Sequence, residues 1–225
     1  MLPRPYPPYP RPHTLTLTQA LRGELGKHVS SLVLSSSPFG DAGMAALAPA
    51  LSRRLVPSLR LTTLEMEDCR LGDDGVAALA SALSAAAGSP RAQPPVRPGG
   101  PRAEGILNRE GVPGLGILRR LCLGSNPIGD RGCTALTDAL LTPPLSALAI
   151  LQLGDTDVGD AGADALADAL SKGAMAHGIQ LWLASTRITH AGRGRIMMAA
   201  SERAAMQEAG AQPPVLAERA MRICW

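Results

Sequence analysis

Hydrophobic and polar residues recur along the chain in a fixed order: an alternating apolar block, a glycine-containing turn, and two apolar residues four positions apart. The alternating block reads Leu-x-x-Leu-x-Leu, so its leucines face one side of a short strand. Copies lie at residues 29–34, 61–66, 118–123 and 148–153, with a worn copy at 181–183. The closing apolar pair falls on one helical face, so each copy predicts a strand followed by a helix.

A turn of the form Gly-Asp-x-Gly separates strand from helix in the first four copies. The glycine ends the strand, and the aspartate is placed to accept hydrogen bonds from free amides in the first turn of the helix. We therefore expect an N-cap at each aspartate, with a contribution of about 0.5–2 kcal/mol. These predicted helix caps are Asp41, Asp73, Asp130 and Asp160.

One such unit cannot bury its apolar face alone, whereas stacked units bury it between them. The repeated order therefore predicts an α/β solenoid, in which parallel strands form one curved sheet and the helices lie on its outer, convex side. In such an array Leu34, Met66, Leu123 and Leu153 lie side by side.

The unit from Leu118 to Leu140 follows the pattern L-x-x-L-x-L-x-x-N-x-I-G-D-x-G-x-x-x-L-x-x-x-L almost throughout. On these residues the chain resembles the ribonuclease-inhibitor-like leucine-rich-repeat family, over roughly residues 29–200. The resemblance implies a partial horseshoe with a concave parallel β-sheet and convex helices. It also implies that Asn126 is a structural turn residue serving buried backbone groups. Small residues replace this asparagine in the other units, namely Ser37, Cys69, Thr156 and Thr186.

The repeat also indicates how the chain is divided. The predicted segments are a disordered Pro-rich tail (1–13), an N-terminal capping half-repeat (14–28), repeat units 1 and 2 (29–85), a flexible Pro/Gly/Arg-rich insertion (86–114), units 3 to 5 (115–200) and C-terminal capping helices (201–225). Residues 86–114 have no apolar period. They are an inserted segment, an eroded repeat or an error in the gene model, and the sequence leaves all three open.

The tail contains Arg4, Pro7 and Pro10 in the spacing of a ligand for SH3 domains. Such short patterns recur by chance, so a solvated tail without a partner is the favoured interpretation.

Composition narrows the class of protein. A net charge of +3 is too mild to predict nucleic-acid binding. No apolar run is long enough to span a membrane, and the N-terminus lacks the apolar core of a secretory signal. The four cysteines form no zinc pattern, so we expect free thiols in a cytoplasmic protein.

The sequence contains no arrangement typical of an enzyme. It lacks Gly-x-Ser-x-Gly, a phosphate-binding loop and His-Glu-x-x-His, so we expect neither catalysis nor a cofactor. The repeated aspartates would stand in a line along the solenoid, whereas a hard cation needs oxygens that converge on one point. We therefore predict no metal site.

Binding has a better-defined place. Residues that alternate with the core leucines point away from the helices, and we predict that they bind a protein. They are Thr63, Glu65, Glu67, Arg120, Ile150, Gln152, Gln180 and Trp182. Trp182 is either a contact residue or packed beneath the C-terminal helices, and the two interpretations are equally favoured. Glu65 and Glu67 are more often simply solvated.

The resemblance implies a non-catalytic protein–protein interaction module that holds an unidentified partner on its concave face. Two alternatives stay open. The chain is similar to GTPase-activating proteins for Ran, which share these repeats but carry an acidic tail that this chain lacks. It is also similar to the repeat fragment of nucleotide-binding innate-immune receptors, which would require a nucleotide-binding segment elsewhere.

Overall fold

The computed structural model describes residues 28–51, 61–85, 118–141, 148–174, 180–210 and 222–225, together with Leu17, Gln19 and Leu21. Within these ranges strands and helices alternate along the chain. In order they are β1 (Ser31–Val33), α2 (Gly40–Leu51), β2 (Thr63–Glu65), α3 (Asp73–Ala85), β3 (Arg120–Cys122), α4 (Asp130–Leu140), β4 (Ile150–Gln152), α5 (Asp160–Ser171), β5 (Gln180–Trp182), α6 (His190–Gly210) and β6 (Arg222–Cys224).

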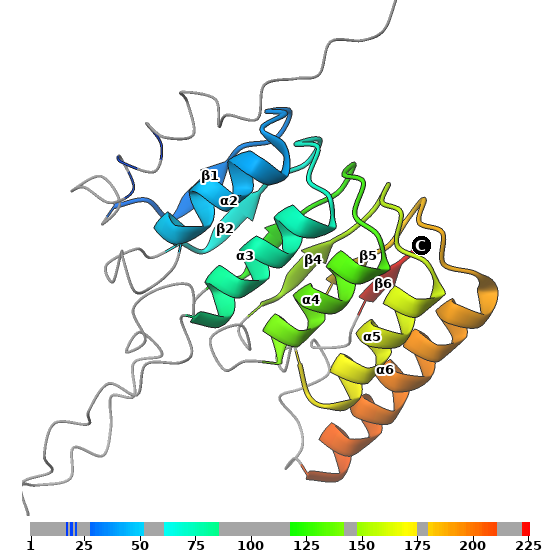
Figure 1. The fold of residues 1–225 in the computed structure, drawn as a ribbon. Coiled ribbons are helices and arrows are strands. Elements are labelled where there is room, and N and C mark those ends of the chain that lie inside the picture. Colours follow the sequence, from blue (N-terminus) through cyan, green and yellow to red (C-terminus); the bar gives the residue numbers. More distant parts are fainter. Residues whose placement is uncertain are drawn as a thin grey trace, which may run out of the picture.

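The strands form one parallel sheet in the order β1-β2-β3-β4-β5-β6 (Figure 1). The pairing register aligns the central apolar residue of every strand, and this row consists of Leu32, Leu64, Leu121, Leu151, Leu181 and Ile223. Hydrogen bonds continue past the strands, for example from the Met66 amide to the Cys122 carbonyl at 2.9 Å and from the Leu123 amide to the Gln152 carbonyl at 2.9 Å. The predicted parallel array of apolar rows is therefore confirmed.

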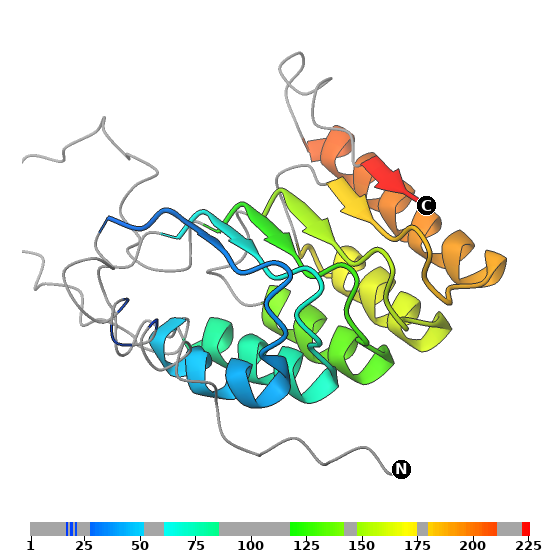
Figure 2. The same cartoon turned by 90° about the horizontal axis from the view of Figure 1, so that it is seen from above.

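The molecule has two layers. Figure 2 shows the strands in one layer and the helices α2 to α6 against one side of it. The apolar side chains between the layers form one continuous core, in which Leu64, Leu121 and Leu151 are fully buried. The other side of the sheet carries no helix among the described residues, and we call it the open face. Its side chains come from the first and third position of each strand.

The long gap between the second and third units does not interrupt the sheet. β2 pairs directly with β3, with Leu64 opposite Leu121, and α3 packs against α4. No further repeat therefore separates these two units in the sheet. The predicted insertion (86–114) and the predicted proline-rich tail (1–13) lie outside the described residues.

Both ends of the array are covered by its own chain, although one end differs from the prediction. Leu21, in the predicted N-terminal half-repeat, is buried in the core. At the other end, the prediction that residues 201–225 form capping helices is wrong in part. α6 runs on to Gly210, but residues 222–224 form strand β6, which adds to the edge of β5. Ile223 and Trp225 pack against the core, because strand alternation turns them toward the helices.

Candidate protein-binding surface

The repeated aspartates connect neighbouring units. The carboxylate of Asp73 accepts hydrogen bonds from the amides of Gly129 and Gly132, at 2.7 and 2.9 Å, and both glycines belong to the next repeat. Asp130 does the same for Gly159 and Gly162. The prediction that each aspartate caps its own helix is wrong. In α4 and α5 the N-cap residue is a glycine with no side-chain bond, and the missing acceptor comes from the preceding unit.

The same arrangement continues to both ends of this row. Asp41 accepts from the Gly72 amide at 2.6 Å. Asp160 accepts from both the amide and the hydroxyl of Thr189, which hold the pKa of the Asp160 carboxyl below its ordinary value. His190 takes the aspartate's place in the last unit, so the row of carboxylates ends there.

Asn126 has the structural role that the sequence predicts. Its amide group donates to the carbonyls of Met66, Leu123 and Gly124 at 2.7–3.0 Å, and its side-chain oxygen accepts from the amides of Cys69 and Leu71. All its hydrogen-bonding groups are satisfied although the residue is buried. Thr156 and Thr186 keep one of these bonds, because each hydroxyl donates to the carbonyl of the leucine that follows the strand of its own unit, Leu153 or Leu183.

The turns after the strands share an unusual backbone conformation. Residues at one aligned turn position have a positive φ between 51° and 59°. This aligned set is Ser36, Asp68, Ser125, Asp155 and Ser185, and the turn after β2 contains a further such residue, Arg70, with φ of 59°. Among non-glycine residues, Asp and Asn tolerate this left-handed region best, and serine adopts it at three of the five positions here. Each amide in the set up to Asp155 bonds to a carbonyl of the following unit, so the row is held in place by its neighbours.

The predicted binding residues lie together on the open face. The register puts Thr63, Arg120, Ile150 and Gln180 in one row across the strands, and Glu65, Gln152 and Trp182 in the next row. Glu67 follows β2 on the same side. Each of these side chains is either half-buried or exposed, and none is fully buried. The structure thus brings the predicted residues into one surface.

Cys122 is an exception among the outward positions. It is only 3% exposed although it alternates with Leu121 and Leu123. It stands in register between Glu65 and Gln152, whose longer side chains flank the smaller thiol. Burial raises the pKa of Cys122 to about 11.

Trp182 lies on the open face and is 42% exposed. The helices, α6 included, lie on the opposite side of the sheet, so the interpretation that Trp182 packs beneath C-terminal helices is wrong (Figure 2). β6 lies beside it and contributes two further outward residues, Arg222 and Cys224. Large aromatic side chains with this exposure are favoured anchors of protein interfaces.

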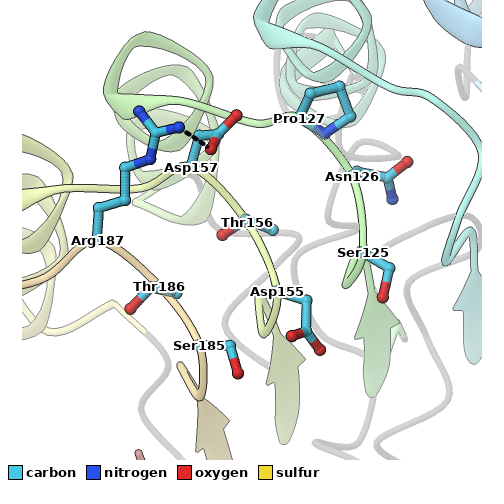
Figure 3. A pocket seen from close by; sticks show the side chains of 9 residues that line it. All are labelled: Ser125, Asn126, Pro127, Asp155, Thr156, Asp157, Ser185, Thr186 and Arg187. Carbon is cyan, nitrogen blue, oxygen red and sulfur yellow. Dashed lines mark ion pairs between the residues drawn. The ribbon is translucent and has the colours of Figure 1, made fainter.

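A shallow groove of about 490 Å³ lies over the turns that follow β3, β4 and β5. We call it the turn groove. Its lining residues are Ser125, Asn126, Pro127, Asp155, Thr156, Asp157, Ser185, Thr186 and Arg187 (Figure 3). Asp157 and Arg187 form an ion pair across it at 2.7 Å.

Comparison with known families and structures agrees with this architecture. The family model described as "Leucine Rich repeat" matches residues 27–48, 60–80, 118–136 and 148–167, which contain β1 to β4 and most or all of the helix that follows each. These four units are leucine-rich repeats. Comparison of these leucine-rich repeats with curated protein sequences gives no match.

Among solved structures, the array is similar to one titled "Leiomodin-1 Actin-Binding Site 2 (ABS2)". The TM-score is 0.51 at 15% sequence identity, and the match covers 88% of this chain and 91% of that chain. At this identity the likeness concerns the leucine-rich-repeat fold.

The sequence did not point to the turn groove of these repeats. Its outermost side chains, Ser125, Asp155 and Ser185, stand at aligned positions of three units. Aligning the repeats therefore puts these three residues at one position. Ser and Asp at such a position are typical of any solvated turn, so the alignment alone does not indicate a groove. The positive φ that turns them outward is visible only in three dimensions.

The described part of the array offers little for catalytic or metal chemistry. No group of three or more His, Cys, Asp or Glu side chains in it could hold a metal ion. The four cysteines are free, and burial raises the pKa of Cys133 to about 12, so this thiol is a poor nucleophile. Among the described helices, none is long and apolar enough to cross a bilayer.

Proposed function

We propose that the chain is a non-catalytic protein-interaction module, of the ribonuclease-inhibitor-like kind, that holds a protein partner on the open face of its sheet. The observation that carries this proposal is Trp182, a tryptophan that is 42% exposed on a sheet face that none of the described helices covers. Exposed tryptophans contribute strongly to interfaces, since they bury a large apolar area when a partner binds.

The neighbours of Trp182 support the same function. Gln152 is the register partner of Trp182 on β4, and Gln180 stands two residues before it on the same face of β5. An apolar anchor with a polar rim is the usual composition of a reversible protein interface. The similar solved structure is named as an actin-binding site, which supports protein binding by this fold but does not identify a partner for this chain.

We infer a cytoplasmic location from the four free cysteines, since unpaired thiols are typical of reducing compartments. The proline-rich tail stays a separate prediction of an SH3 ligand, which binding to isolated SH3 domains would test.

The test compares variants that remove one exposed apolar side chain from opposite sides of the molecule. Trp182→Ala changes the open face, and Met198→Ala changes α6, where Met198 is 65% exposed. Proteins captured from a native extract by the wild type are expected to be retained by Met198→Ala and lost, by about tenfold or more, with Trp182→Ala. Circular dichroism at 25 °C checks that both variants are folded.

Equal capture by the two variants would exclude the open face as the binding surface. A captured GTPase whose hydrolysis rate rises on addition of the chain would favour the GTPase-activating alternative. A longer transcript that encodes a nucleotide-binding segment would favour the receptor-fragment alternative.

A further inference from the structure

The turn groove has an unbalanced charge. Two carboxylates, Asp155 and Asp157, and one guanidinium group, from Arg187, line it. Arg187 pairs with Asp157, whereas the exposed carboxylate of Asp155 has no hydrogen-bond or ion-pair partner among the described residues. The groove therefore has one uncompensated negative charge in a chain whose net charge is +3.

Two hydroxyl groups flank this carboxylate. Ser125 and Ser185 occupy the equivalent positions in the neighbouring turns, with φ of 54° and 56° against 55° at Asp155. Neighbouring strands are about 4.8 Å apart, so hydroxyl, carboxylate and hydroxyl stand in a line (Figure 3). Neither serine side chain bonds to another described residue. The amides of Ser125 and Asp155 are already bonded to Gly154 and Ala184, which fixes the backbone before a ligand arrives.

These groups select a cation. A carboxylate between two hydroxyls offers several acceptors, which match the donors of a guanidinium or ammonium group. Asp155 repels an anionic ligand, and a purely apolar side chain would leave the polar groups without partners.

The row continues toward the start of the array. Asp68 takes the same turn position two strands away from Asp155, and its exposed carboxylate also has no partner among the described residues. Two strand spacings place these acids about 10 Å apart. In a polyproline-type segment every third residue lies on the same side at about 9.3 Å, so cationic residues three apart fit this distance.

We propose that the protein partner presents an extended basic segment, with Arg or Lys at every third position, whose cationic side chains lie in the turn groove at Asp155 and beside Asp68. This inference rests on the proposed function, because it names the chemistry of the partner that the open face and its turns hold.

The test uses a fluorescein-labelled peptide of three Gly-Ser-Arg copies, titrated with the full chain and followed by fluorescence anisotropy. Peptides with citrulline or glutamate in place of arginine are the controls, since citrulline keeps the shape of arginine without its charge. We expect the arginine peptide to bind about tenfold more tightly than either control.

Matched variants then locate the binding. Asp155→Asn is expected to weaken arginine-peptide binding about threefold to tenfold. Asp138→Asn removes the same charge from the exposed side of α4, and is expected to leave the affinity unchanged within about twofold.

The inference is overturned if the citrulline peptide binds as tightly, if both variants have the same effect, or if the arginine peptide does not bind at about 1 mM protein. None of these outcomes affects the proposed function, whose own test is the loss of a native partner in Trp182→Ala. If Trp182→Ala keeps the native partner while Asp155→Asn weakens the peptide, the proposed function fails at the open face and the groove stands as a separate basic-peptide site.

Discussion

Asp73 provides the sharpest test of how the repeats are held together. It is the first residue of α3, but its carboxylate accepts hydrogen bonds from Gly129 and Gly132 in the next unit. Asp74 is its direct neighbour and carries the same charge in the same helical turn. The Asp74 side chain is 75% exposed and forms only a surface ion pair with Arg131. The two residues are therefore a matched pair that differs in the contact between repeats.

The two contacts predict different losses of unfolding free energy when each aspartate is replaced by alanine. A hydrogen bond to a charged acceptor contributes about 1.5–3 kcal/mol, and an N-cap about 0.5–2 kcal/mol. Because Asp73 is half-buried, water replaces part of what is lost, and we expect Asp73→Ala to lower the free energy of unfolding by about 1.5–3 kcal/mol. An exposed ion pair contributes about 0–1 kcal/mol, so Asp74→Ala should fall in that range.

Urea unfolding followed by circular dichroism measures both values, and hydrogen exchange locates the effect. In Asp73→Ala the amides of Gly129 and Gly132 should exchange faster, although they are 56 and 59 residues away in sequence. Equal destabilisation by the two variants, or faster exchange confined to α3, would refute capping between repeats.

Three further predictions concern the core. Leu121→Ala, at the centre of the sheet and fully buried, should lower the free energy of unfolding by about 2–5 kcal/mol in urea titrations, and a loss comparable to a surface substitution would contradict the register. Asn126→Ala removes bonds to five backbone groups, of which the Gly124 carbonyl still accepts from the Asp68 amide, so we expect a loss of about 2–4 kcal/mol in the same assay, whereas a neutral result would mean that water replaces the side chain. Thiol labelling of the folded chain near pH 7.5 should modify Cys224 first and Cys133 last, because burial raises the pKa of Cys133 to about 12, and mass spectrometry would show any reversed order.

The strands and the core could be predicted from the sequence because the repeat supplies the same information several times. Leu64, Leu121 and Leu151 occupy one column of the alignment, and stacking converts that column into one row of the sheet. β6 escaped prediction because Arg222–Cys224 keeps a single aliphatic residue of the pattern, Ile223. Such a short segment forms a strand because it hydrogen-bonds to the free edge of β5, and its own residues favour a strand only weakly.

The candidate surface was predictable in its position but not in its contacts. Alternation identified the outward side chains, but it could not assign the exposure of Trp182 or the burial of Cys122, since both depend on neighbouring strands. The partner of each aspartate was ambiguous for a related reason. Every unit contains both the donor glycines and the acceptor carboxylate, so periodicity cannot distinguish a bond within a unit from one between units.

The direction of these bonds gives the array a polarity. Each unit supplies a carboxylate acceptor to the next unit and receives its own from the unit before it. The hydrogen-bonded unit therefore begins at the aspartate of one repeat and ends in the helix of the following repeat, whereas the sequence repeat begins at its strand. A transplanted or duplicated unit would therefore need a carboxylate upstream as much as its own leucines. Adding a repeat after α6 would require an aspartate in place of His190, because His190 provides no carboxylate to accept hydrogen bonds from the amides of the added turn.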